Sequence, residues 1–92
     1  MRRDRIKAIV KFGEEIGQNS KYAKVESNRK LLLHRFHQGT NYKGLVDKII
    51  IMAQESNITL PIEVSYYSSR KEDFEMFFIV FMIALNNTIN NK

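Results

Sequence analysis

Residues 76–85 read MFFIVFMIAL, ten consecutive side chains with no charge among them. A helix on the surface of a globular protein normally carries polar side chains along one face, and this run supplies none. The run is also too short to cross a bilayer, which takes about 20 apolar residues. It therefore predicts a helix that protein covers on most of its sides.

The small size of the chain limits how much of such a helix it can cover alone. A domain of about this length buries roughly 60–65% of the surface of its unfolded chain. The hydrophobic content of 43% and charged content of 27% are typical of a folded domain rather than a disordered segment. We expect a single domain over residues 1–92, with a thin core that a partner would extend.

The N-terminal half contains two helical segments. The first is predicted over residues 3–16, ends at Gly17, and would turn the following residues inward: Ile6, Ile9, Val10, Gly13 and Ile16. Gly13 on that face would let another helix approach closely. The second lies within residues 21–38, capped by Ser20 or Ser27 and stopped by Gly39. The pattern leaves open whether it is one helix or a short turn followed by a helix from Glu26.

The C-terminal half predicts two more helices. The clearest period covers residues 42–53, capped by Thr40 or Asn41, with these apolar positions: Tyr42, Leu45, Val46, Ile49, Ile50 and Ala53. Ser69 and Glu72 form a capping box that begins the last helix. Its main apolar stripe is Phe74, Phe77, Phe78, Phe81 and Leu85, spaced as core residues are. From Asn86 to Lys92 the chain is polar and is predicted to fray.

Residues 56–69 are predicted to form an ordered, non-helical crossing between these two helices. Pro61 interrupts the segment, and its apolar residues alternate as in an extended chain: Leu60, Ile62, Val64 and Tyr66. Tyr66 or Tyr67 would pack against the helices. The fold expected is all-α, a compact bundle of four to five helices with a hydrophobic C-terminal helix.

Charge is unevenly distributed along the chain. Residues 1–48 hold twelve Lys and Arg against five acids, whereas residues 49–92 hold three against five. This asymmetry favours an anionic partner for the first half, most commonly nucleic acid, although a solvated face that aids solubility is the alternative. Helical geometry selects eight candidates for phosphate contact: Arg2, Arg3, Lys7, Lys11, Arg29, Lys30, Arg35 and Lys43. Without a recognition helix, we expect contact with the backbone rather than base readout.

Signals for catalysis and metal binding are weak. The chain has no cysteine, no Gly-rich phosphate loop and no Gly-x-Ser-x-Gly motif. His34 and His37 lack a nearby carboxylate to complete a metal site, and adjacent Glu14 and Glu15 diverge by about 100° on a helix. We expect no enzyme activity and no cofactor. Lys7 and Lys11 interrupt the N-terminal apolar stretch, which excludes a signal peptide and favours the cytoplasm.

The order of these features resembles one protein family. The stretches IKAIVKFGEEIG, NRKLLLHRF, YKGLVDKIIIMAQ and LPIE precede the closing apolar helix. This order is similar to the C-terminal helical region of the large subunit of type I CRISPR interference complexes. In several such systems that region is also made separately as the small subunit of Cascade. The resemblance covers nearly the whole chain and rests on helix order and an Ile-x6-Gly-x2-Ile-Gly pattern.

The resemblance implies a non-catalytic helical subunit, present in more than one copy within a ribonucleoprotein complex. Its partners would be guide RNA, target DNA, the Cascade large and backbone subunits, and copies of itself. Basic contacts that ignore sequence would hold the guide–target heteroduplex and the displaced non-target strand, because base pairing reads the sequence in such complexes. The side of the last helix facing other subunits would comprise Met76, Phe78, Ile79, Met82 and Ile83.

Two other functions fit the same sequence. A free-standing DNA-binding regulator, dimeric through its last helix, would bind a particular duplex without RNA. A helical protein-interaction adaptor would use its basic face for solubility only and would show no salt-dependent affinity for nucleic acid.

Overall fold

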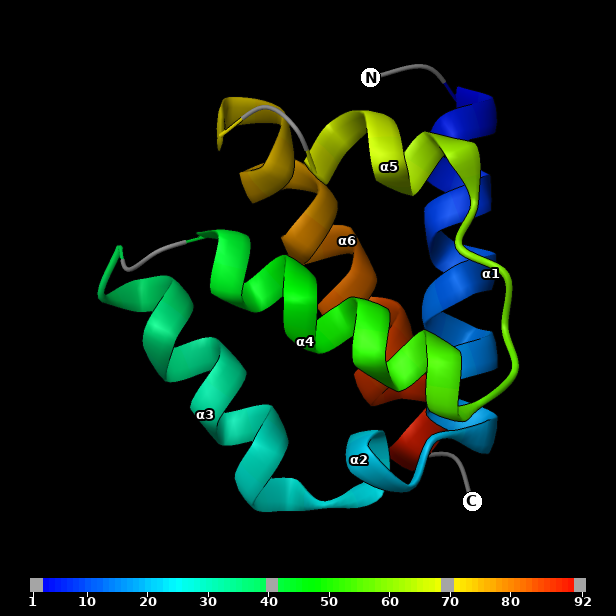
Figure 1. Cartoon of the computed structure of the whole chain (residues 1–92), viewed down its shortest axis with the longest axis vertical. Helices are drawn as coiled ribbons and strands as arrows, with labels where there is room; N and C mark the ends of the chain where they lie inside the picture. Colours follow the sequence, from blue (N-terminus) through cyan, green and yellow to red (C-terminus); the bar gives the residue numbers. More distant parts are fainter. Residues whose placement is uncertain (1–2, 40–41, 69–70, 91–92) are drawn as a thin grey trace.

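The computed structural model describes residues 3–39, 42–68 and 71–90, and all regular structure in these ranges is α-helical. The helices are α1 (Arg3–Asn19), α2 (Lys21–Lys24), α3 (Glu26–His37), α4 (Tyr42–Glu55), α5 (Ile62–Ser68) and α6 (Lys71–Asn90) (Figure 1). The radius of gyration is 11.9 Å, close to the roughly 12 Å expected of a compact chain this long. The all-α, compact fold is confirmed, with six helices in the described ranges instead of four or five.

The core is built around α6, whose phenylalanines meet aromatic rings from three other helices. The centroid of the Phe81 ring lies 5.6 Å from that of Phe12 on α1, and Phe78 stacks on Phe36 of α3 at 4.6 Å. Phe74 lies 5.5 Å from Tyr42 of α4. All five residues of the predicted main stripe are buried, so these rings are core and present no base-stacking surface.

The contact between α1 and α6 is the most extensive between any two helices. It depends on the glycine predicted to face inward. A Cβ placed on Gly13 would lie 2.9 Å from both the Ala84 Cβ and the Phe81 carbonyl oxygen. Four residues later, a Cβ on Gly17 would lie 3.0 Å from the Thr88 Cβ. Missing side chains at these two positions therefore let the helix backbones pack closely.

Residues 21–37 form two helices, which is the second of the arrangements left open by the sequence. Ser20 is buried and caps α2, with its Oγ accepting a hydrogen bond from the Ala23 N–H at 3.3 Å. Val25 is extended and separates α2 from α3. The predicted stop at Gly39 is confirmed, since its φ of 65° ends α3 in a conformation that glycine adopts without strain. The alternative caps Thr40 and Asn41 of the next helix lie outside the described residues.

The prediction of an extended crossing was wrong for residues 62–68, which form α5. Pro61 immediately precedes this helix, and its carbonyl oxygen accepts hydrogen bonds from the N–H groups of Val64 and Ser65. A proline is tolerated at a helix start because no intrahelical partner is needed there for its missing N–H. In a strand Ile62 and Val64 would share one face, but Ile62 is 81% exposed and Val64 is 2% exposed. The side chains of Tyr66 and Tyr67 lie outside what the structure describes.

Two helices run further than the sequence suggested. α1 passes the predicted end at Gly17 and continues to Asn19, because the second close contact with α6 falls at Gly17. α6 continues through the polar residues to Asn90, and the Thr88 Oγ1 donates a hydrogen bond to the Ala84 carbonyl at 2.9 Å. Ser69 of the predicted capping box and residues 91–92 lie outside the described ranges.

Candidate nucleic-acid and subunit interfaces

The outer face of α1 carries the candidate cations Arg3, Lys7 and Lys11, hereafter the α1 basic stripe. All three are exposed because they lie opposite the apolar residues that α1 buries, among them Ile9 and Phe12. Their spacing of four residues aligns them along the helix. Within the described part of the chain, none of the three has an ion-pair or hydrogen-bond partner. These charges are therefore accessible to an anionic ligand.

The candidate cations of α3 lie on the other side of the molecule, as the positions of α1 and α3 in Figure 1 show. Lys30 pairs with Glu26 one turn earlier, with 3.3 Å between Nζ and Oε1, and both side chains are largely exposed. Arg35 on α3 and Lys43 on α4 are exposed and have interactions of their own. The structure thus separates the candidates into two groups instead of one surface, and Arg2 lies outside the described residues.

Arg29 differs from the other candidates because it is half-buried and engaged within the fold. Its Nη1 donates a hydrogen bond to the Oδ1 of Asn86 on α6 at 3.2 Å. The Nε–H of the same side chain is buried and has no partner in the described chain. A guanidinium tied across two helices in this way supports the packing of α3 on α6, and we remove Arg29 from the candidate phosphate-binding group.

We expect Asn86→Ala to lower the free energy of unfolding by about 1–3 kcal/mol, since it removes the acceptor of a charged, partly buried donor. Thermal unfolding followed by circular dichroism measures the effect. Asn90→Ala is the matched control, because Asn90 lies one turn further along α6 and is exposed. Equal stabilities for the two variants would contradict a packing role for Arg29.

The predicted subunit-facing residues of α6 divide into two sets. Phe78 and Met82 are 1% and 3% exposed and belong to the core, so their side chains cannot contact another subunit. Met76, Ile79 and Ile83 are 52%, 45% and 57% exposed. These three residues, spaced by three and four positions, form the α6 ridge. Of the predicted subunit-facing residues, those of the α6 ridge remain candidates, because α1, α3, α4 and α5 pack against the other sides of α6.

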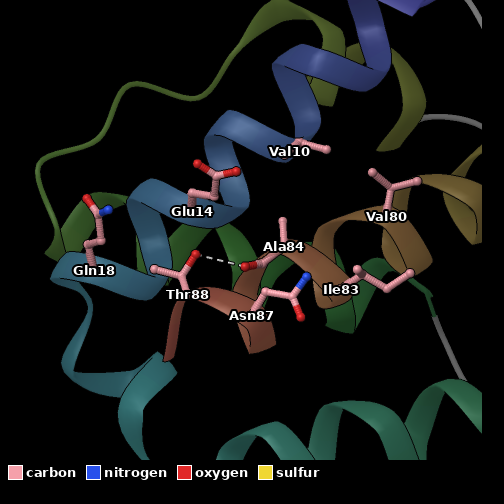
Figure 2. A pocket seen from close by; sticks show the side chains of 8 residues that line it. All are labelled: Val10, Glu14, Gln18, Val80, Ile83, Ala84, Asn87 and Thr88. Carbon is pink, nitrogen blue, oxygen red and sulfur yellow. Dashed lines mark hydrogen bonds between the residues drawn. The ribbon is translucent and has the colours of Figure 1, made fainter. Parts of the chain in front are cut away.

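On the side of the α6 ridge, a groove of about 650 Å³ runs along the contact between α1 and α6, and Ile83 belongs to both the ridge and the groove. Figure 2 shows its lining, with Val10 and Val80 on opposite walls and Ala84 between them. We call this the α1–α6 groove; its remaining lining residues are Glu14, Gln18, Ile83, Asn87 and Thr88. No sequence pattern indicated this groove, because it runs alongside the close α1–α6 contact at Gly13 and Gly17 and depends on how the two helices pack.

No group of three or more His, Cys, Asp or Glu side chains within the described ranges is arranged to hold a metal ion. His34 and His37 are both exposed on α3. None of the described helices has the length and apolar character needed to cross a membrane.

No family model, no curated protein and no solved structure matches this chain.

Proposed function

We propose that this chain is a non-catalytic helical subunit of a ribonucleoprotein assembly, in which it contacts nucleic-acid backbone without reading sequence. The observation that carries the proposal is the α1 basic stripe, with three aligned, exposed cations that have no partner in the described chain. Eight residues of helix separate its ends, a distance of about 12 Å. One strand of a duplex places a phosphate about every 3.4 Å along the helix axis, and the stripe therefore has more than one phosphate within reach.

The assembly we propose is a type I CRISPR Cascade complex in the cytoplasm, with this chain as its small subunit. Support comes from the order of helical segments and the Gly13 and Gly17 pattern, which resemble that family. The two groups of cations, on α1 and on α3, would then serve different strands, one the guide–target heteroduplex and the other the displaced strand. The hydrophobic C-terminal helix would complete the fold and face a neighbouring subunit.

A second candidate function is a helical protein-interaction adaptor without nucleic acid. The exposed α6 ridge favours it, because three large aliphatic side chains on one exposed helix face are characteristic of a protein contact. This candidate requires no role for the α1 basic stripe, so a nucleic-acid titration separates the two.

The test is fluorescence anisotropy of labelled single-stranded DNA, duplex DNA and RNA–DNA hybrid, each in two unrelated sequences, over a salt series. We expect weak binding of all sequences that falls steeply with salt. Lys7→Glu with Lys11→Glu should weaken binding at least tenfold and reduce the salt slope on single strands by about 1.4, or 0.7 for each lost phosphate contact.

The matched control is Lys21→Glu with Lys24→Glu on α2, which lowers the net charge of +5 by the same four units at two other exposed lysines. If both double variants lose affinity equally, net charge and not the α1 basic stripe drives binding. Absence of binding at any salt would favour the adaptor, and strong preference for one duplex sequence would contradict backbone contact.

A further inference from the structure

We propose that two copies of this chain associate about a two-fold axis, with their α6 helices antiparallel and each α6 ridge seated in the α1–α6 groove of the other copy. This gives a definite geometry to the self-association included in the proposed function. Its test uses no nucleic acid, so that either proposal can fail while the other stands.

The outward side of α6 lacks the charges that keep a helix face in water. From Met76 to Asn90 the sequence contains no Asp, Glu, Lys or Arg, although the α6 ridge is about half exposed along two turns. A soluble surface helix ordinarily places charged residues there. Single exposed aliphatic residues need no explanation, but a contiguous ridge beside a groove with Val10, Val80 and Ala84 in its lining indicates a surface that another protein covers.

A second copy fits this surface because ridge and groove lie side by side on the same chain. In a two-fold interface the same patch meets itself, so a patch must contain both the projecting part and the part that receives it. Ile83 on the ridge is next to Val80 and Ala84, which line the groove with Val10 of α1 (Figure 2). A rotation that seats one ridge in the opposite groove therefore seats the other ridge as well.

The charges at the ends of α6 select the antiparallel orientation. The first turns carry the exposed carboxylates of Glu72 and Glu75, whereas the last turns carry exposed Asn87, in the lining of the α1–α6 groove, and exposed Asn90. With the axis between Ile79 and Val80, Glu72 of one copy lies beside Asn87 of the other, and Met76 lies beside Ile83. An asparagine amide can donate a hydrogen bond to a carboxylate. Parallel packing would instead oppose the two Glu72 carboxylates and align the helix dipoles unfavourably.

The chain contains no cysteine, and single cysteines therefore report this geometry directly. The Met76→Cys and Ile83→Cys proteins are treated with a short bis-maleimide, first separately and then as a mixture of the two. Antiparallel packing predicts that the mixture gives abundant cross-linked dimer, whereas either variant alone gives little. Ile79→Cys, next to the axis, should cross-link to itself. Efficient cross-linking of Met76→Cys alone and Ile83→Cys alone would indicate parallel packing and overturn the proposal.

Sedimentation equilibrium tests the association itself. We expect the unmodified chain to be dimeric at about 100 μM, a concentration that saturates a contact with a micromolar Kd. Ile79→Glu and Ile83→Glu should raise the Kd by roughly tenfold or more. The matched control is Ile51→Glu on α4, where the isoleucine is similarly exposed at 44%.

Circular dichroism should show that each variant keeps its helical content, because all three substituted positions are exposed. If the unmodified chain is monomeric, the proposal is wrong, and the α6 ridge would then bind a different protein. Retention of the dimer by both α6 variants also overturns it, because the contact would then lie elsewhere on the surface.

Discussion

Phe81→Asp is expected to unfold the chain. Phe81 is fully buried and its ring contacts those of Phe12 and Phe77, so an aspartate would leave both a cavity and a charge with no counter-ion. Removing a buried phenylalanine costs about 3–5 kcal/mol, and an uncompensated buried charge costs a similar amount. Together these penalties approach the whole stability of a domain of this size, roughly 5–14 kcal/mol.

Far-UV circular dichroism and gel filtration measure this loss, which should appear as a low helical signal or as aggregation. Phe78→Asp should behave in the same way, because Phe78 is 1% exposed and stacked on Phe36. Ile51→Asp introduces the same charge at an exposed position of α4 and should remain folded. A soluble, fully helical Phe81→Asp protein would show that α6 is not the centre of the core.

Gly13→Ala is expected to destabilise the protein even though alanine is the better helix former. The added Cβ meets the backbone carbonyl of Phe81 and the Cβ of Ala84 at 2.9 Å, so α1 must move away from α6. Overpacking of this kind costs about 1–3 kcal/mol, and the destabilisation should prevail over the helix propensity gained, about 1 kcal/mol. Each kcal/mol lost lowers the Tm of so small a domain by roughly 4–8 °C.

Gly44→Ala supplies a control of opposite sign. Gly44 is exposed on α4, and apart from its own helix backbone and chain neighbours no described atom lies within 4 Å of the position its Cβ would occupy. There alanine gains helix propensity without a clash and should raise stability by about 0.4–1 kcal/mol. An equal rise in Tm for both variants would mean that α1 and α6 are not packed through Gly13.

The helical pattern of the sequence predicted α1, α4 and α6 because each buries one long stripe at helical spacing. The same reasoning failed for residues 62–68, because among the described side chains of residues 62–65 Val64 alone is buried, and one buried position gives no period. Pro61 was interpreted as a break in regular structure, but a proline is also common at the start of a helix. Gly17 was interpreted as a helix end because its actual role, contact with Thr88, depends on a residue 71 positions away.

The candidate interface was predicted only in part, for a related reason. A helix with apolar residues on every side does not reveal from its sequence which of them face outward. The packing of the other helices against α6 decides that Phe78 and Met82 are covered and that Ile79 and Ile83 are not. By contrast, the exposure of Lys7 and Lys11 followed directly from the apolar stripe on the opposite side of α1.

The pairing of α1 with α6 also determines the order in which this chain can fold. The residues that α1 buries meet partners near the opposite end of the sequence, and contacts of such long separation slow folding. During synthesis α1 leaves the ribosome with its apolar stripe uncovered, and so do the helices that follow, until α6 is made. The segment from α1 to α6 therefore leaves the ribosome without a closed core, and a delay before α6 is made leaves its apolar surface open to aggregation.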